Sequence, residues 1–421
     1  MEAGRGRRFL HTGRPQSLSG ESEVHGGEKD DDRHDEIAHE SSTLGKLRDV
    51  WMLVQWSGLG RETGVVALGA NSRPNRTRKA WALYRRHETS RDPVARLSDL
   101  NDFEGSRIVV IDKPESVQMK IQDLRHVGLL SPAIAAHAKF YLEAWGLQSA
   151  GEDQHARYFR GSSTEHHILS LHPADRRGLH HLAFSVEGRE AVDAAATELE
   201  RRGTTIVARA DELDQPGGGY GLRFLDPENR CIELSADVTG HSSGSSAEGV
   251  GPRRLCHVVL NTARFDQVVE FYTAVLGFRV SDWNENQMAF LRCSRKHHVI
   301  AFNRLDHASV NHVAYVMADV DGVMRGLSNL RARGQEPDWG PGRHGPGNNI
   351  FCYYKDPAGY VSEFSSDMEH IEDEAAHEPA VWRRVPEQID RWGTAGPPSA
   401  DVRKAMAGDP DPGWPVKDTP R

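Results

Sequence analysis

The sequence predicts an α+β protein in which βαβββ units stand in tandem, two in each of two domains. Short apolar runs with strand character recur after about residue 120, and helical patterns separate them in a regular order. Histidines within these runs recur at a fixed offset: His126 and His181 lie 55 positions apart (181 − 126), as do His257 and His312 (312 − 257). Two unrelated domains would not share such an offset, so the sequence predicts an internal duplication.

The first predicted domain spans residues 119–238. It opens with a strand over residues 124–130, and a helix then runs from Pro132 to Gly146. Proline near a helix start and glycine after its end is the expected asymmetry. Three short strand candidates follow, and the last covers residues 165–172. The second unit contains a strand over 179–186, a helix over 189–203 and a strand–turn–strand over 220–234.

A Gly/Ser-rich linker, residues 239–252, leads to the second predicted domain, residues 253–370. The same order of elements recurs there. Its last strand follows an Asp-Pro turn, and the turn aspartate precedes the strand glutamate by seven positions in both domains (233 − 226 and 363 − 356). The predicted strands are 255–260, 288–292, 297–302, 312–316, 349–354 and 360–364, and the predicted helices are 265–277 and 320–334.

The two ends of the chain show no such order. Residues 1–118 are expected to be a largely disordered extension, because their first part is rich in charged and small residues and cannot bury enough apolar surface to offset its ordering entropy. Residues 371–421 form a proline-rich tail. We expect residues 382–393 to pack on the second domain and the end of the chain to be flexible.

Composition narrows the classes of function. A net charge of −9 argues against a nucleic-acid-binding protein, which would be basic. No apolar run approaches a membrane span, and the charged N-terminus does not resemble a signal peptide. The cysteines lie in or beside apolar runs without a Cys-x-x-Cys pair, so we expect reduced thiols and a cytoplasmic protein. They are Cys231, Cys256, Cys293 and Cys352.

Three residues of the second domain, His257, His312 and Glu363, are the candidate metal ligands. Each lies on its own predicted strand. Because side chains alternate along a strand, one ligand from each of three strands can meet in one cup. Two imidazoles and one carboxylate form the facial triad of non-haem iron(II) sites with open positions.

The first domain carries an equivalent trio, His126, His181 and Glu233, so the triad alone does not identify the site. Ten positions before the last glutamate stands Arg223 in the first domain and Tyr353 in the second. A guanidinium would place a fixed positive charge beside a cation site. We therefore expect the metal in the second domain and interpret the first trio as a relic of duplication, with its metal binding left open.

Residues 120–395 resemble the two-domain extradiol ring-cleaving dioxygenases (catechol 2,3-dioxygenase-like) of the vicinal oxygen chelate, or glyoxalase, superfamily. The resemblance rests on His257, the Lys296-His297-His298 run, Asn311-His312, Gly342-Arg343-His344, Tyr353 with the turn Asp356 to Gly359, and Glu363. It implies that His257, His312 and Glu363 bind Fe(II), with Mn(II) also open, and that the first domain is metal-free. It further implies His298 as the acid/base and His344 and Tyr353 as groups that touch the bound diol and oxygen.

The implied reaction cleaves a catechol-type ring next to its diol with O2, as in the catabolism of aromatic compounds. Catechol and O2 are then the partners, without nucleic acid or membrane, and the resemblance implies a homo-oligomer. A metal-dependent isomerase or lyase of the glyoxalase type and a non-enzymatic small-molecule-binding protein of the same superfamily are the alternatives. Asp282 to Asn284 and Arg343 are candidate pocket residues, and the identity of the catechol is open.

Overall fold

The computed structural model describes residues 50–57, 63–70, 106–111, 119–241 and 251–414. The chain divides into two units, residues 1–113 and 114–421. In the first unit, a three-stranded antiparallel sheet has the order β1-β2-β3, which the sequence does not predict. The rest of the predicted disordered extension lies outside the described residues. The strands are β1 (Val50–Ser57), β2 (Thr63–Ala70) and β3 (Ser106–Ile111).

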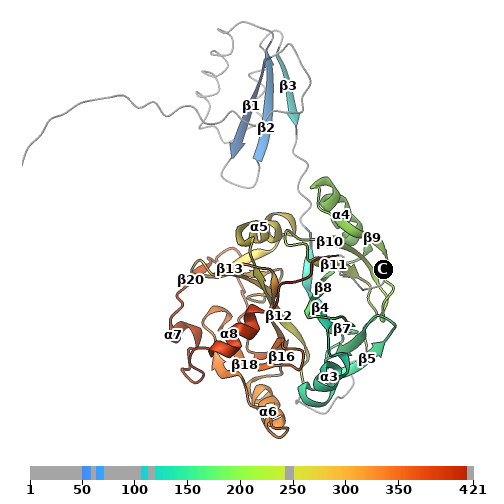
Figure 1. Ribbon diagram of the computed structural model, residues 1–421. Helices are drawn as coiled ribbons and strands as arrows, with labels where there is room; N and C mark the ends of the chain where they lie inside the picture. The colour runs from blue at the N-terminus through green and yellow to red at the C-terminus, as the bar shows by residue number, and fades with distance from the viewer. Residues whose placement is uncertain (1–49, 58–62, 71–105, 112–118, 242–250, 415–421) are drawn as a thin grey trace, which may run out of the picture. The chain divides into compact units, whose positions relative to one another are not determined.

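The second unit begins with an eight-stranded sheet of order β5-β6-β7-β4-β8-β11-β10-β9. Its two βαβββ units meet where β4 pairs with β8, as the sequence predicts (Figure 1). The strands are β4 (Ile121–Ser131), β5 (Gln148–Glu152), β6 (Arg157–Arg160), β7 (Leu169–Pro173), β8 (Gly178–Val186), β9 (Ile206–Glu212), β10 (Tyr220–Leu225) and β11 (Cys231–Ala236).

A nine-stranded sheet of order β17-β18-β19-β16-β12-β15-β14-β13-β20 repeats this arrangement in the second half. Most of the linker, residues 242–250, lies outside the described residues. The strands are β12 (Arg254–Thr262), β13 (Arg279–Asn284), β14 (Met288–Arg292), β15 (Ile300–Arg304), β16 (Ser309–Val316), β17 (Trp339–Arg343), β18 (Ile350–Lys355), β19 (Val361–Ser366) and β20 (Ala380–Trp382).

The helices between the strands place apolar side chains on the sheets. In α6 (Val320–Arg331), Val323, Leu327 and Leu330 are buried at the three- and four-residue spacing of a helix face. The side chain of Asp319 caps its start by accepting a hydrogen bond from the Gly322 amide at 2.7 Å. The other helices of the two halves are α3 (Ile134–Lys139) with the π-helical η1 (Phe140–Trp145), α4 (Arg189–Arg201), and α5 (Phe265–Glu270) with the π-helical η2 (Phe271–Val275).

The two halves are joined by crossed contacts. Asp356, in the Asp-Pro turn of the second half, accepts hydrogen bonds from His137 and Tyr141 of the first half at 2.6 and 3.2 Å. Asp226, in the matching turn of the first half, lies 3.5 Å from the hydroxyl of Tyr272 in η2. Both aspartates are buried, so these contacts lie inside one continuous core.

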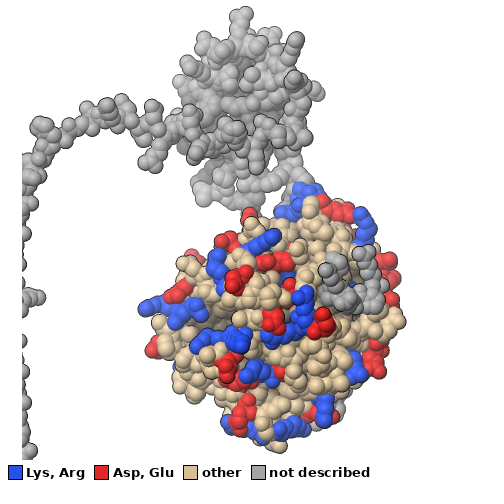
Figure 2. All heavy atoms as spheres, in the orientation of Figure 1, with Lys and Arg blue, Asp and Glu red and all other residues tan. Residues whose placement is uncertain are grey.

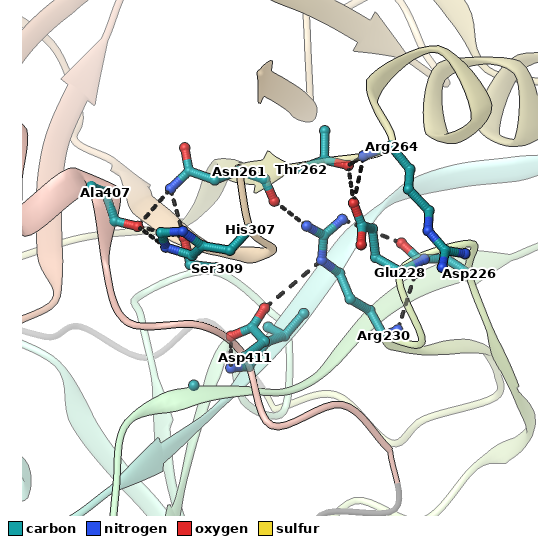
Figure 3. Close-up of polar contacts among 12 residues, drawn as sticks. Asp226, Glu228, Arg230, Asn261, Thr262, Arg264, His307, Ser309, Ala407 and Asp411 are labelled. Atoms are coloured by element: carbon teal, nitrogen blue, oxygen red, sulfur yellow. Dashed lines mark hydrogen bonds and ion pairs between the residues drawn. The ribbon is translucent and has the colours of Figure 1, made fainter. Parts of the chain in front are cut away.

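The tail packs on the second half and extends its sheet. Strand β20 pairs in parallel with β13. The last described helix, α8 (Ala400–Ala407), ends where the Ala407 carbonyl accepts hydrogen bonds from Asn261 and Ser309 (Figure 3). Beyond it, Asp411 lies 3.9 Å from the buried guanidinium of Arg230, in the first half (Figure 3). Among the residues described, no helix is both long and apolar enough to cross a membrane.

Candidate metal centre

Three adjacent strands, β12, β16 and β19, bring His257, His312 and Glu363 to one face of the second sheet. Ala314 lies opposite His257 on β12 and beside Glu363 on β19. Residues directly opposite one another share a face, and His312 stands two positions before Ala314 on the same strand. All three candidate ligands therefore point to the same side, and all three are buried.

The candidate ligand atoms form a triangle. His257 Nε2, His312 Nε2 and Glu363 Oε2 are 3.3 Å apart along every side. Divalent ions bind such atoms at about 2 Å, which places neighbouring ligands about 3 Å apart. Glu363 Oε2 has no hydrogen-bond donor among the described residues although it is fully buried. A buried carboxylate oxygen without a donor fits a cation, so the residues present suit a metal ion.

Neighbouring amides orient two of these candidate ligands. Asn349 donates a hydrogen bond to Glu363 Oε1 at 3.1 Å, which leaves Oε2 for the triangle. His312 Nδ1 lies 2.8 Å from Asn311 Oδ1. Although burial opposes ionisation, the nearby His257 and His312 hold the pKa of the Glu363 carboxyl below its usual range. The carboxylate is thus ready to bind a cation at neutral pH.

His298 lies beside the triangle, with its ring centroid 4.4 Å from that of His257. The prediction that His297 and His298 lie on a strand is wrong, because β15 begins only at Ile300. The backbone of Lys296 instead forms an isolated antiparallel β-bridge with His370. The imidazoles of His298 and His297 form a hydrogen-bonded chain that leads from the centre to Asp282. Their Nδ1 atoms are 2.9 Å apart, and His297 Nε2 lies 3.0 Å from Asp282 Oδ2.

His344 and Tyr353 form a hydrogen-bonded pair beside the triangle, where the ring centroid of Tyr353 lies 5.2 Å from that of His312. His344 follows β17, and Tyr353 on β18 lies directly opposite Glu363 on β19. His344 Nδ1 is 3.0 Å from the Ile389 carbonyl, which can only accept, so His344 Nε2 is the acceptor toward Tyr353. The Tyr353 hydroxyl therefore donates to His344 across 2.9 Å. Burial raises the pKa of Tyr353 and keeps the phenol protonated.

The first-half trio has the same backbone arrangement but different partners. His126 and His181 Nε2 are only 2.6 Å apart, which is a hydrogen-bond distance. Arg223 lies opposite Glu233 in the sheet, as Tyr353 lies opposite Glu363, and its guanidinium contacts Glu233 Oε2 at 2.8 Å. One ligand atom from each of the three residues still lies within 4.8 Å of the others, which is close enough for a shared metal ion. Its carboxylate, however, is already paired with a cation.

Two other predicted pocket positions have structural partners. Asp282 accepts a hydrogen bond from the Trp382 indole at 2.6 Å, in addition to its contact with His297. The Arg343 guanidinium lies over the Trp392 ring and pairs with Asp367 at 3.1 Å. The two tryptophan contacts join the second half to the tail, and the Asp367 contact joins Arg343 to the end of β19. The contribution of these residues to a substrate pocket stays a prediction.

The supporting roles of several residues around the site were not predicted from the sequence. Asn349, Asn311 and Ile389 orient candidate functional groups, and only Asn311 adjoins a strand histidine in the sequence. Ile389 contributes a backbone carbonyl, for which a sequence offers no signal. Asn349 lies 14 positions before Glu363, a spacing that becomes meaningful only once β18 and β19 are known to pair.

Comparisons with known proteins agree with this duplicated fold. The family model of the Glyoxalase/Bleomycin resistance protein/Dioxygenase superfamily matches twice, at residues 123–234 and 254–364. A metapyrocatechase 2 from Cupriavidus necator is 29% identical over 273 residues, which is 60% of this chain and 82% of that protein. A manganese-dependent 2,3-dihydroxybiphenyl 1,2-dioxygenase from Geobacillus genomosp. 3 is 25% identical, over 60% of this chain and 90% of that protein.

Solved structures show the same relationship. The Mn(II)-bound glyoxalase from Novosphingobium aromaticivorans superimposes with a TM-score of 0.63 at 37% identity, covering 66% of this chain and 93% of that one. A homoprotocatechuate 2,3-dioxygenase variant from B. fuscum superimposes with a TM-score of 0.59 at 23% identity, covering 67% and 81%, and so supports the fold alone. Two family matches that together cover more than half of the sequence show that the chain belongs to the Glyoxalase/Bleomycin resistance protein/Dioxygenase superfamily.

Proposed function

We propose that this chain is an extradiol dioxygenase that cleaves a catechol-type ring next to its diol, using O2 and an Fe(II) ion held by His257, His312 and Glu363. The observation that carries the proposal is the buried triangle of ligand atoms with sides of 3.3 Å, flanked by His298 and by the His344–Tyr353 pair. Relatives named 3-methylcatechol 2,3-dioxygenase and 2,3-dihydroxybiphenyl 1,2-dioxygenase support the choice of substrate class. Mn(II) is the alternative ion, because the same ligand set binds both.

When bound, the metal would supply Lewis acidity toward both oxygens of a diol and an open position for O2. The chain supplies the proton movements. Asp282 is acceptor-only when ionised, so His297 donates to it through Nε2–H and presents Nδ1 as an acceptor. His298 then donates through Nδ1–H, which leaves its Nε2 free to take a proton from a substrate hydroxyl and return it later.

Other residues orient the substrate and exclude water. Phe290 lies edge-on to the His298 ring, with centroids 5.1 Å apart, and both side chains are buried. Burial lowers the pKa of His298 well below its ordinary value, so the imidazole begins the reaction as a base. Beside His312, Tyr353 donates a hydrogen bond to His344, which leaves its hydroxyl oxygen able to accept one from a bound diol. His298 and Tyr353 therefore both offer acceptors to a diol that enters protonated.

The proposal is tested by oxygen uptake with a panel of catechols after anaerobic loading with Fe(II), and in parallel with Mn(II). Ring cleavage with stoichiometric O2 uptake is expected with at least one catechol. Absence of uptake together with absence of metal binding would overturn the proposal. Light scattering of the loaded protein tests the homo-oligomer that the family resemblance implies.

A sharper test replaces His298 with phenylalanine. The His298→Phe variant should keep its metal, because the triangle is intact, and lose most turnover, by about 10²- to 10⁴-fold. His155→Phe, at a partly exposed position in the first half, is the matched control and should retain turnover. If His298→Phe lost the metal instead, His298 would be a ligand and the assignment of the triangle would be wrong.

A metal-dependent isomerase or lyase is the second candidate, because the relative with 37% identity is named a Mn(II)-bound glyoxalase. Such an enzyme would use the same triangle with a base beside it and would consume no oxygen. Incubating the Mn(II)-loaded protein with thiohemiacetals of 2-oxoaldehydes under anaerobic conditions separates the two. Turnover without O2 favours the isomerase, and turnover only with catechol and O2 favours the dioxygenase.

A further inference from the structure

The first half contains a second group of buried titratable side chains that the proposed reaction does not use. We call it the first-half cluster: His126, His167, His172, His180, His181, Arg223 and Glu233. The histidines and Glu233 are each at most 7% exposed. The ring of His167 lies 4.3 Å from that of His126, which repeats the 4.4 Å between His298 and His257. The cluster therefore repeats the placement of the histidine rings at the candidate metal centre.

One difference separates the two halves at the carboxylate. In the second half, Glu363 Oε2 has no hydrogen-bond donor among the described residues. In the first half, Arg223 donates to Glu233 Oε2 from Nε at 2.9 Å and contacts it from Nη2 at 2.8 Å. The guanidinium thus occupies the lone pairs that a cation would need. It also supplies the positive charge that a buried carboxylate requires.

The remaining ligand atoms of the first-half cluster are those of an incomplete metal site. Glu233 Oε1 is buried without a hydrogen-bond partner among the described residues. His126 and His181 turn their Nε2 atoms toward each other at 2.6 Å, so at least one nitrogen must be protonated. A metal ion would replace that proton as the group shared by the two nitrogens.

The charge of Arg223 also opposes a metal. Its Nη2 lies 2.8 Å from Glu233 Oε2, an oxygen of the candidate trio. Because repulsion scales with charge, a guanidinium at this distance opposes a divalent cation at the same oxygen. The imidazoles of His126 and His181 are competent ligands once the guanidinium is removed.

We propose that Arg223 is the resident cation of a latent second metal site, and that it keeps His126, His181 and Glu233 free of metal. With Arg223 replaced by a neutral side chain, the trio would bind one divalent ion of the Mn(II), Fe(II) or Zn(II) class through two imidazoles and one carboxylate. The inference concerns metal binding by the first half. It does not depend on the reaction proposed for the second half.

The test counts metal in variants at position 223. Arg223→Tyr recreates the tyrosine–glutamate pairing of the second half. Arg223→Gln removes the positive charge and keeps a polar side chain. Each should bind one more equivalent of Mn(II) per chain than its parent in equilibrium dialysis, with a second Mn(II) signal in electron paramagnetic resonance. Arg223→Lys keeps the charge and should gain none. Adding His126→Ala to Arg223→Gln should remove the gained equivalent.

A His257→Ala background separates the two halves, because it removes a candidate ligand of the second centre. In that background, Arg223→Gln should bind one equivalent where its parent binds none. Two outcomes would overturn the inference. In the first, the His257→Ala parent already binds a metal ion, and adding His126→Ala removes it. In the second, a folded Arg223→Gln variant binds no more metal than its parent. Circular dichroism shows whether each variant is folded. If Arg223→Tyr does not fold, metal binding by Arg223→Gln decides the test. A gained equivalent without any turnover would leave this inference intact while the proposed dioxygenase failed.

Discussion

His312 Nδ1 lies 2.8 Å from the side-chain oxygen of Asn311. The end of helix α8 determines which of the two atoms donates this hydrogen bond. The carbonyl of Ala407 can only accept, so the Asn261 amide nitrogen donates to it (Figure 3). The same nitrogen donates to the Met406 carbonyl. Asn261 Oδ1 then accepts from Asn311 Nδ2 at 2.9 Å. Asn311 Oδ1 is left to accept from His312 Nδ1–H, which turns the lone pair of Nε2 toward the candidate metal centre.

Replacing Asn311 with alanine should weaken metal binding. Without its partner at Nδ1, His312 can adopt the other tautomer or rotate, and loss of such a partner typically costs about 10- to 100-fold in metal affinity. Competition with a chelator measures the change. Asn329→Ala makes the same substitution where the amide donates to the Ala144 carbonyl, away from the centre, and should leave affinity unchanged. Equal affinities for the two variants would contradict the chain of amides.

Replacing Asp282 with asparagine should lower turnover while metal content stays constant. Asp282 acts on His298 only through His297, so it is a positioning residue, and we expect a loss of about 10- to 100-fold in kcat. Steady-state rates with metal analysis of the same samples provide the measurement. Asp193→Asn, on α4, is the control because its carboxylate accepts from the Tyr220 hydroxyl of the first half and does not contact His297 or His298. A parallel loss of metal would show that Asp282 acts on the structure of the centre instead.

Stability should fall in acid because of buried histidines in the first half. Burial lowers the pKa of His172 from 6.5 to about 3, so between these values the unfolded chain binds a proton that the folded chain does not. The free energy of unfolding therefore falls as pH decreases from 6.5, by about 1.4 kcal/mol per pH unit for this group. Urea unfolding between pH 8 and pH 4.5 should show a shallower slope for His172→Gln than for the wild type. The difference at pH 8 reports lost packing alone, and identical slopes would refute the expectation.

The turn aspartate of the second half should be important for stability. Asp356 is buried and accepts from His137 and Tyr141 of the first half and from two backbone amides of its own turn. Asp356→Ala leaves these donors unpaired, and we expect a loss of about 3 kcal/mol in the free energy of unfolding. Asp266→Ala removes an ion pair whose carboxylate is 84% exposed and should change stability by less than about 0.5 kcal/mol. Chemical denaturation of both variants decides, and similar losses would show that the crossed contact contributes little.

Much of the fold could be predicted because the duplication is recorded in offsets between residues. The 55-residue spacing of the strand histidines reflects β4 pairing with β8 and β12 with β16, so the central strands were placed correctly. Edge strands such as β9 and β17 were missed, since their sequences alternate less clearly. The helices before Gly146 and Gly277 were predicted, but their π-helical second turns were not, because that change follows from packing and not from local propensity.

The candidate site could be predicted only in part. Arg223 and Tyr353 were recognised as the difference between the halves, and the sheet register indeed places each opposite the strand glutamate. The prediction that residues 382–393 pack on the second domain is confirmed, but the sequence could not show which residues they reach there: Ile389 accepts from His344, and Trp382 donates to Asp282. Such contacts join segments that are distant along the chain, and no periodic pattern marks them.

The crossed contacts between the halves have a consequence for how this protein could arise. Tyr141 and Tyr272 each follow their strand histidine by 15 positions (141 − 126 and 272 − 257), and each meets the turn aspartate of the other half. Arg230 and Tyr360 each follow the turn aspartate of their own half by four positions. Arg230 donates to the Asn261 carbonyl of the second half, and Tyr360 donates to the Leu130 carbonyl of the first half. The interface is therefore pseudo-symmetric: equivalent positions of the two halves contact each other reciprocally, as in an isologous interface. A chain with a single half could have built the same interface as a homodimer, before gene fusion joined the two copies and allowed only one to acquire Arg223.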